Sequence, residues 1–273
     1  MTSEIKLIAI DMDGTLLNEK NEITDNTQKI LKNIAAKGVH IALATGRVYV
    51  SVKSYKDLTG IPFSIACTNG SLAFDEEDKE IYYKPLNGFQ LETTLNLLET
   101  EDIYFHLYTR DGLVTPYGDH PKASIVGRMP KGKEHLMKQI ILPMEELKKI
   151  DETIYKIIII ENDNEKRRSF RKKLDEAGIS TSSSWHNNIE ITDEQANKKE
   201  ALQRILHRYS LEWEEVIAFG DNENDLPMLH AAGQAYLMGN ASDELKQSVD
   251  FPVIKTNREE GVYHQLKELF EEC

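Results

Sequence analysis

The sequence predicts an α/β protein: a parallel sheet with helices on both faces, and a second α+β unit inserted into it. Short apolar runs alternate with longer amphipathic runs in the first third of the chain, and this alternation returns after residue 197. Such alternation is typical of β-α-β order, in which helices connect parallel strands. The middle third has a different pattern, so the chain is expected to leave one domain and later return to it.

The first third supplies the predicted start of the sheet. Helices are expected at Asp25–Lys37, between Thr24 as a start signal and Gly38 as a stop signal, and at Val48–Leu58. Two short runs around an acidic turn, Ser71–Phe74 and Ile81–Lys84, predict a hairpin. Apolar runs predict three strands before it: Lys6–Ile10, His40–Ala44 and Phe63–Cys67.

The middle unit is assigned to residues 85–192, and the sheet domain to 1–84 and 193–273. The expected elements of the middle unit are helices at Phe89–Thr100 and Glu165–Ala177 and strands at Ile103–Thr109, Leu113–Pro116, Ile154–Ile160 and Asn188–Thr192. The elements expected after it are helices at Lys199–Tyr209, Asp225–Ala232, Asp243–Val249 and from Gly261, with strands at Val216–Phe219 and Gln234–Met238.

Composition limits the possible partners. The 273 residues suffice for one large domain or two modest ones, and a formal net charge of −13 repels nucleic acids and anionic membranes. Two cysteines, Cys67 and Cys273, are too few for a disulfide framework. No apolar run approaches the roughly 20 residues that span a bilayer, and the run before Asp11 does not resemble a signal peptide. We expect a cytoplasmic protein with no nucleic-acid or membrane partner.

The strongest local signal is Asp11-Met12-Asp13-Gly14-Thr15, which follows the first predicted strand. Open parallel sheets bind ligands at the carboxyl ends of their strands. Residues two apart on a strand share a face, so both carboxylates can point into one crevice. Gly14 permits a tight turn that brings backbone N–H groups toward an anion. The motif alone is also compatible with an Asx turn that caps a strand.

Three further groups of polar residues lie near the predicted core sheet. Residues 44–47, Ala-Thr-Gly-Arg, offer a hydroxyl group and amides that suit either a phosphate oxygen or a helix N-cap. Residues 220–225, Gly-Asp-Asn-Glu-Asn-Asp, bring carboxylates and amides to the mouth of the sheet, and such hard oxygen ligands suit Mg²⁺. Lys198, where the chain re-enters the sheet domain, can neutralise a bound phosphate.

Jointly these residues resemble the haloacid dehalogenase superfamily, and within it the Cof-type phosphatases, which have a Rossmann-like core and a large α/β cap. The resemblance covers essentially the whole chain and makes residues 85–192 the cap that sets substrate specificity. The motifs that carry it occur in the family's order: Asp-x-Asp-Gly-Thr at 11–15, Ala-Thr-Gly-Arg at 44–47, Thr-Asn-Gly at 68–70, Lys198, and Gly-Asp-x-x-Asn-Asp at 220–225.

The resemblance implies a Mg²⁺-dependent phosphatase that hydrolyses small phosphorylated metabolites, such as sugar phosphates, through an aspartyl-phosphate intermediate. It makes Asp11 the nucleophile and Asp13 the general acid/base. The other implied site residues are phosphate or substrate contacts at Met12, Thr45, Gly46, Lys198 and Asn224, magnesium ligands at Asp11, Asp13, Asp221 and Asn222, and a supporting carboxylate at Asp225.

The residue types suit this chemistry. A phosphate monoester is a dianion, so a carboxylate approaches it only where a metal ion, a lysine and backbone amides offset the repulsion. The second carboxylate would protonate the leaving oxygen and then activate water. The sequence departs from the family at Lys199, where a glycine usually follows the lysine. Ala201 and Leu202 keep the register, so Lys198 is the expected contact.

Other functions use parts of the same set of residues. A phosphomutase has the same Asp-x-Asp pair but returns the phosphoryl group to a bound sugar. A receiver-like phospho-acceptor protein binds Mg²⁺ but has its acidic pair and acceptor on different strands and lacks a middle unit. A catalytically inactive scaffold would not need every site position filled. The expected partner is a small phosphorylated metabolite, and the expected state is a monomer or a weak homo-oligomer.

Overall fold

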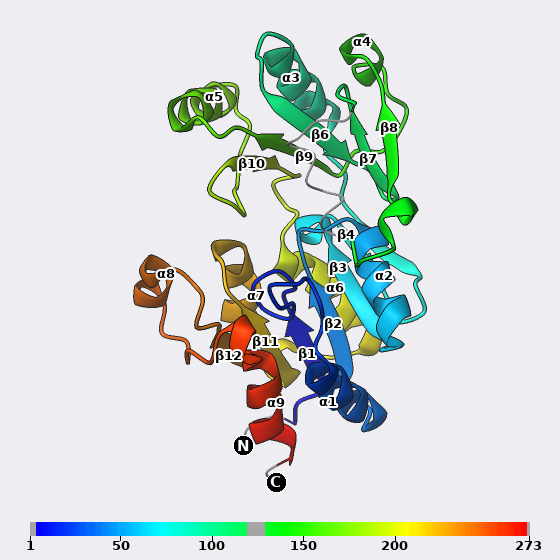
Figure 1. Cartoon of the computed structure of the whole chain (residues 1–273), viewed down its shortest axis with the longest axis vertical. Coiled ribbons are helices and arrows are strands. Elements are labelled where there is room, and N and C mark those ends of the chain that lie inside the picture. The colour runs from blue at the N-terminus through cyan, green and yellow to red at the C-terminus, as the bar shows by residue number, and fades with distance from the viewer. Residues whose placement is uncertain (1–3, 119–128, 272–273) are drawn as a thin grey trace.

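The computed structural model describes residues 4–118 and 129–271, so Cys273 lies outside it. Two sheets dominate the structure, one of seven strands and one of five. Figure 1 shows them one above the other, with both termini at the end of the molecule farthest from the five-stranded sheet. The predicted α/β class with a parallel core sheet is confirmed.

The seven-stranded sheet combines strands from both ends of the chain. Its members are β1 (Leu7–Ile10), β2 (His40–Ala44), β3 (Phe63–Cys67), β4 (Leu72–Phe74), β5 (Glu80–Tyr83), β11 (Val216–Gly220) and β12 (Gln234–Leu237). They lie in the order β12-β11-β1-β2-β3-β4-β5. The first five strands of this order are parallel, and β4 and β5 form the predicted antiparallel hairpin at the edge. The carboxyl ends of β1 and β11 therefore meet.

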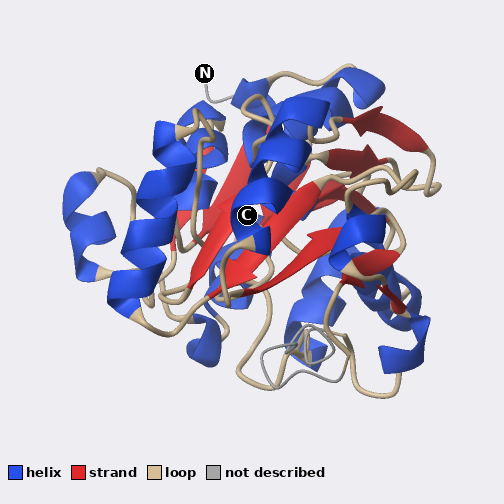
Figure 2. Ribbon diagram, turned by 90° about the horizontal axis from the view of Figure 1, so that it is seen from above, coloured by secondary structure: helices blue, strands red, loops and turns tan. Residues whose placement is uncertain are grey.

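Helices cover both faces of this sheet (Figure 2). Ile8 and Ile10 of β1 pack with one set of helices, whereas Leu7 and Ala9 pack with the other, because successive strand residues point to opposite faces. The first set is α1 (Asp25–Ala36), α2 (Tyr49–Thr59) and α9 (Gly261–Glu271). The second set is α6 (Lys198–Tyr209), α7 (Leu226–Ala231) and α8 (Asp243–Ser248). We call this sheet and its helices the sheet core.

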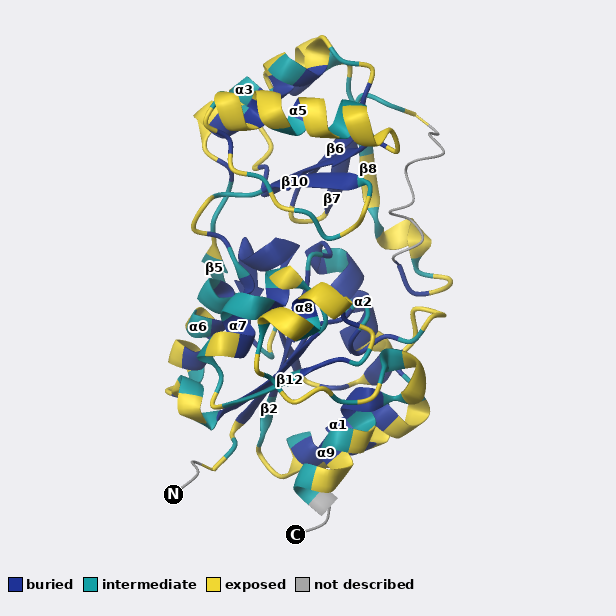
Figure 3. Ribbon diagram, turned by 90° about the vertical axis from the view of Figure 1, so that its left-hand side faces the viewer, coloured by how far each residue is buried: buried dark blue, intermediate teal, exposed yellow. Residues whose placement is uncertain are grey.

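The five-stranded sheet lies entirely between residues 104 and 191. Its strands are β6 (Tyr104–Tyr108), β7 (Gly112–Thr115), β8 (Lys138–Ile141), β9 (Lys156–Ile160) and β10 (Asn188–Ile191), in the order β10-β9-β6-β7-β8. Its outer face packs against α3 (Gly88–Glu99), α4 (Met144–Leu147) and α5 (Asn164–Glu176), whose outward sides are largely exposed (Figure 3). On its other face, Tyr104 and Ile158 pack with Val48 of the sheet core. We call this sheet, these helices and the loops that connect them the inserted unit.

Among the strands of the described residues, β8 is the one that the sequence pattern did not predict. It is an edge strand that pairs only with β7, and three of its four residues are exposed. An exposed edge strand does not need the apolar alternation that identifies a half-buried strand. No helix in the described ranges is both long enough and apolar enough to cross a membrane.

The two crossings between the sheet core and the inserted unit lie side by side. The Lys84 ammonium is 3.8 Å from the Asp193 carboxylate. The Gln90 side chain donates a hydrogen bond of 3.2 Å to the carbonyl of Thr192. The inserted unit therefore leaves and rejoins the sheet core at a single place.

The turn after β3 packs closely against the start of α6. Gly70 ends this turn with a φ of +89°, and a Cβ atom there would lie 2.0 Å from the carbonyl oxygen of Asn197. A residue with a side chain would therefore meet both backbone strain and a backbone clash.

We expect Gly70→Ala to destabilise the protein by at least about 3 kcal/mol, since overpacking against backbone adds to the strain of a positive φ. Gly38 is the matched control because its φ is +88° and nothing lies within 4 Å of its Cβ position. Gly38→Ala should cost only about 1 kcal/mol. Urea unfolding measures both values, and equal losses would contradict the proposed clash.

Candidate active site

The candidate site lies where β1 and β11 end. The parallel register aligns Ile10 with Phe219, and the backbone N–H of Asp11 donates a 3.0 Å hydrogen bond to the carbonyl of Phe219. Asp11 and Asp221 therefore leave the same edge of the sheet. Carboxylate oxygens of Asp11, Asp221 and Asp225 lie within 4.8 Å of one another.

Lys198 joins two of these carboxylates. Its Nζ is 2.6 Å from Oδ1 of Asp11 and 2.6 Å from Oδ1 of Asp225, and its side chain is 1% exposed. Helix α6 begins at Lys198, and the Asn197 side chain caps it by accepting a hydrogen bond from the backbone N–H of Glu200. The lysine in place of the usual glycine at position 199 is thus accommodated within the first turn of this helix.

Asp225 also fixes the loop that carries Asp221. Its Oδ2 accepts hydrogen bonds of 3.0 Å from the backbone N–H groups of Asp221 and Asn222. One fully buried carboxylate therefore holds the lysine with one oxygen and the loop backbone with the other.

Asp13 is paired with a buried arginine. Arg47 donates from Nε to Oδ2 of Asp13 at 2.8 Å and from Nη2 to Oδ1 at 2.6 Å. The guanidinium is itself held by the Tyr55 hydroxyl and the Asn21 side chain, both at 3.2 Å. The Arg47 side chain is fully buried, whereas that of Asp13 is 36% exposed. A fixed arginine thus orients an accessible carboxylate.

Three other predicted site residues, Thr45, Met12 and Asn222, have different surroundings. Thr45 is fully buried, and its hydroxyl oxygen accepts a 3.2 Å hydrogen bond from the backbone N–H of Arg47. The Met12 side chain lies in the hydrophobic core, so only its backbone can face a ligand. Oδ1 of Asn222 accepts a 2.8 Å hydrogen bond from the backbone N–H of Glu223, so this oxygen is already engaged within its own loop.

A cavity of about 270 Å³ lies beside Asp11, Asp13 and Asp221. Ser184 and Trp185 of the inserted unit face the sheet core across it, and Nδ2 of Asn222 donates a 3.3 Å hydrogen bond to the carbonyl of Ser184. The lining residues are Asp11, Asp13, Gly14, Gly46, Ser184, Trp185, Asp221, Asn222 and Asn224.

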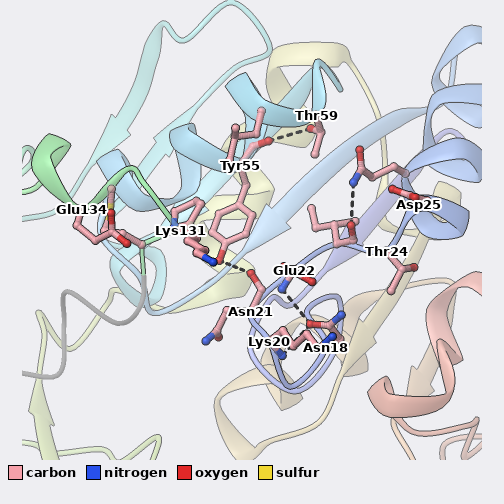
Figure 4. Close-up of a pocket in the computed structure, with 15 residues that line it drawn as sticks. Asn18, Lys20, Asn21, Glu22, Thr24, Asp25, Tyr55, Thr59, Lys131 and Glu134 are labelled. Atoms are coloured by element: carbon pink, nitrogen blue, oxygen red, sulfur yellow. Dashed lines mark hydrogen bonds between the residues drawn. The ribbon is translucent and has the colours of Figure 1, made fainter.

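A larger cavity of about 920 Å³ lies elsewhere, between residues 18–28, helix α2 and residues 129–134 (Figure 4). Tyr55 lines it and donates to the carbonyl of Asn21 at 2.8 Å. This cavity lacks Asp11 and Asp221 among its described lining residues. The smaller cavity is therefore the candidate active site.

Sequence reasoning gave no role to Arg47 or Asn240. Arg47 is the last residue of the Ala-Thr-Gly-Arg motif at 44–47. An arginine in the core needs an acidic partner, and this requirement could have pointed to Asp13. Asn240 donates from Nδ2 to the carbonyl of Gly14 at 2.8 Å and to Oδ2 of Asp221 at 3.3 Å. It therefore connects the turn after β1 to the loop after β11.

Comparison with known proteins places the chain in a family. The profile of the family described as haloacid dehalogenase-like hydrolase matches residues 8–266. The chain belongs to this family. It is therefore an enzyme of the hydrolase class, as the resemblance in the sequence implied.

Similar proteins extend over the full chain. Phosphatase YwpJ of Bacillus subtilis is 30% identical over 97% of this chain and 100% of its own length. The 5-amino-6-(5-phospho-D-ribitylamino)uracil phosphatase YwtE of the same organism is 30% identical over 97% of this chain and 98% of its own. A solved haloacid dehalogenase-like hydrolase from B. subtilis is 29% identical, with a TM-score of 0.85 over 97% of this chain and 100% of that one. Phosphatase is the activity that the two named relatives share.

The electrostatics of the hydrolase site favour a bound cation. Burial raises the pKa of Asp11 well above its ordinary value, Lys198 lowers it, and Asp225 and Asp221 raise it further. Burial and the neighbouring Asp225 raise the pKa of Asp221 to about 7. Burial would lower the pKa of Lys198, but the Asp11 and Asp225 carboxylates raise it above its ordinary value. Three carboxylates within 4.8 Å of one another, two of them paired with Lys198, are a donor set that could hold a divalent cation.

We expect the Asp221 carboxyl to destabilise the metal-free hydrolase increasingly as the pH rises from about 4 to 7. The pKa of Asp221 is higher in the folded chain than its ordinary value of 3.8, so the unfolded chain releases this proton first as the pH rises. This one carboxyl would lower the free energy of unfolding by up to about 4 kcal/mol. Thermal or urea unfolding in a chelator at several pH values measures it.

Asp221→Asn should flatten this pH dependence and raise the stability of the metal-free protein above pH 7. Asp243→Asn is the control, because the Asp243 side chain is 88% exposed, and its pH profile should match the wild type. An added divalent cation should also stabilise the wild type at pH 7.5. A pH profile unchanged by Asp221→Asn would refute the electrostatic account of the site.

Proposed function

We propose that this hydrolase is a Mg²⁺-dependent phosphatase of small phosphorylated metabolites, which forms an aspartyl phosphate on Asp11. The observation that carries the proposal is the cluster of Asp11, Asp221 and Asp225, in which Lys198 pairs with Asp11 and Asp225. Asp13 lines the same cavity as Asp11 and Asp221. Phosphatase activity is also the property that the relatives' names share.

Asp11 is the nucleophile in this proposal. Its carboxylate oxygen forms a bond to phosphorus while the bond from phosphorus to the ester oxygen breaks. Its position at the end of β1, with the backbone N–H bonded to Phe219, fixes the direction of attack. Lys198 holds the carboxylate by Oδ1 and supplies positive charge toward the phosphoryl group.

Asp13 is the general acid and then the general base. It donates a proton to the departing ester oxygen and later takes a proton from the water that hydrolyses the aspartyl phosphate. Arg47 engages both of its oxygens, so we assign Arg47 to the orientation of this carboxylate. The moderate exposure of Asp13 leaves it accessible to the leaving group and to water.

Further residues would bind the phosphoryl group. Thr45 and Gly46 follow β2, and Gly46 and Asn224 line the cavity. Met12 would contribute only its backbone N–H, since its side chain is in the core.

Asp11 and Asp221, with the backbone carbonyl of Asp13, would hold Mg²⁺, and Asn222 is the weaker candidate. When bound, the ion would neutralise charge that develops on the phosphoryl oxygens. Asp225 is better suited to support than to ligation, because its oxygens already accept from Lys198 and from two backbone N–H groups.

The inserted unit, with residues 85–192 as its boundaries, is proposed to be a cap over residues 1–84 and 193–273. Its support is direct contact at the site. Nδ2 of Asn69 donates a 2.6 Å hydrogen bond to Oε2 of Glu190, and Asn222 bonds to Ser184. A cap at this position would exclude water from the cavity and contact the leaving group.

Asp11→Asn is expected to reduce phosphate release by at least ~1000-fold while the protein stays folded, because it removes the nucleophile but keeps its shape. Asp13→Asn should still be phosphorylated by an activated aryl phosphate but should hydrolyse the adduct slowly. Intact-protein mass spectrometry would then detect one added phosphoryl group, mapped to Asp11. Near wild-type turnover by Asp11→Asn would refute the proposal.

Lys198→Ala is expected to lower kcat/KM by roughly 100- to 1000-fold, since it removes the buried ammonium that faces Asp11. Lys199→Ala is the matched control at the next position and should change kcat/KM less than about threefold. Circular dichroism and a melting curve would show that both variants fold. A larger effect at Lys199 than at Lys198 would contradict the assignment.

A further inference from the structure

The loop before β10 brings the inserted unit to the candidate site. Ser184 and Trp185 belong to this loop and line the cavity that also holds Asp11 and Asp13. The hydrogen bond from Asn222 to the Ser184 carbonyl joins the loop to the sheet core. Trp185 therefore lies beside the space that a leaving group would occupy when the phosphoryl group is at Asp11.

Buried groups hold this loop in place. Oδ1 of Asn188 accepts hydrogen bonds from the backbone N–H groups of Ser184 at 3.2 Å and of Trp185 at 3.0 Å. The Ser184 hydroxyl donates a 2.6 Å bond to Oε1 of Glu190, whose Oε2 is 2.8 Å from Nζ of Lys156. Asn188, Glu190 and Lys156 are all buried. The backbone position of Trp185 is thus determined by the sheet of the inserted unit.

Trp185 differs in chemistry from its neighbours in the cavity. Among the lining residues within 4–118 and 129–271, it alone has an aromatic side chain, and the others are aspartates, asparagines, a serine and glycines. It keeps 39% of its surface exposed. An accessible indole offers a large flat apolar face, which binds the face of a ring far better than a flexible open chain.

We propose that Trp185 determines the specificity of the enzyme by stacking on a ring in the leaving group. This inference rests on the proposed phosphatase function and narrows its substrates to monoesters whose alcohol carries a ring. The ring is either a planar heterocycle, which presents a flat face, or a sugar in its cyclic form, which presents a face of C–H groups. Open-chain polyol phosphates gain no such contact.

The test compares three phosphate esters in steady-state phosphate release. Glucose 6-phosphate and sorbitol 6-phosphate differ mainly in whether the sugar is cyclic, and pyridoxine 5′-phosphate carries a heteroaromatic ring. Trp185→Ala should lower kcat/KM at least about tenfold for the ring ester that the wild type prefers. It should change kcat/KM for sorbitol 6-phosphate less than about twofold, and Trp185→Phe should keep most of the preference.

Ile141→Ala is the matched control, because Ile141 is an exposed apolar residue of the inserted unit outside the cavity lining. It should leave all three values unchanged. Equal losses for ring and open-chain esters in Trp185→Ala, or no loss at all, would overturn the assignment. The ring ester with the larger loss of kcat/KM in Trp185→Ala identifies the kind of ring that the enzyme prefers.

A binding measurement separates this inference from the proposed function. The chain has two tryptophans, Trp185 and Trp213, so Trp213→Phe leaves Trp185 as the single indole. In that background with Asp11→Asn, pyridoxine 5′-phosphate or glucose 6-phosphate should change the tryptophan emission saturably, and sorbitol 6-phosphate should not. An emission change without turnover in the Asp11-intact protein would refute only the phosphatase function. Turnover of an aryl phosphate without discrimination at Trp185 would refute only this inference.

Discussion

The buried ion pairs of Lys198 are the interaction on which the rest of the site depends. An ammonium that is almost completely withdrawn from water is stable only next to negative charge, and Asp11 and Asp225 provide it. Asp225 in turn organises the loop of Asp221 through two backbone hydrogen bonds. The first strand, the helix α6 and the loop after β11 are thereby fixed to one another, although they are distant in the sequence.

The four aspartates of the site make different contacts. Both oxygens of Asp225 accept hydrogen bonds from Lys198 or the loop backbone, whereas Asp11 and Asp221 line the cavity. Asp13 is oriented by Arg47, which is anchored by Tyr55 and Asn21. The two carboxylates of the Asp-x-Asp motif thus face different cations, and this gives chemically identical groups different environments.

The fold class could be predicted from the sequence, and so could the gathering of Asp11, Asp221 and Asp225 at the ends of β1 and β11, because both depend on local patterns. A strand buried on both faces, such as β1, is a continuous apolar run, and polar residues at its end are conspicuous. Other features depend on contacts between distant segments. Arg47 pairs with a residue 34 positions away, and edge strand β8 lacks an apolar pattern. The role of Trp185 depends on how a serine-rich loop packs on the sheet core, which periodicity cannot indicate.

The adjacent crossings at Lys84 and Asp193 have a consequence for how the chain folds. The 108 residues between them, if flexible, would make joining β11 to β1 a long loop closure that costs about 4 kcal/mol of chain entropy. A folded inserted unit holds its two ends at the spacing of a short turn and removes roughly 2.5 kcal/mol of that cost. During synthesis, Lys198 also emerges after the entire inserted unit. The inserted unit is therefore synthesised before β1, already followed in the chain by its neighbour β2, can acquire β11 as its second partner and before Asp11 can acquire Lys198 as its counter-ion.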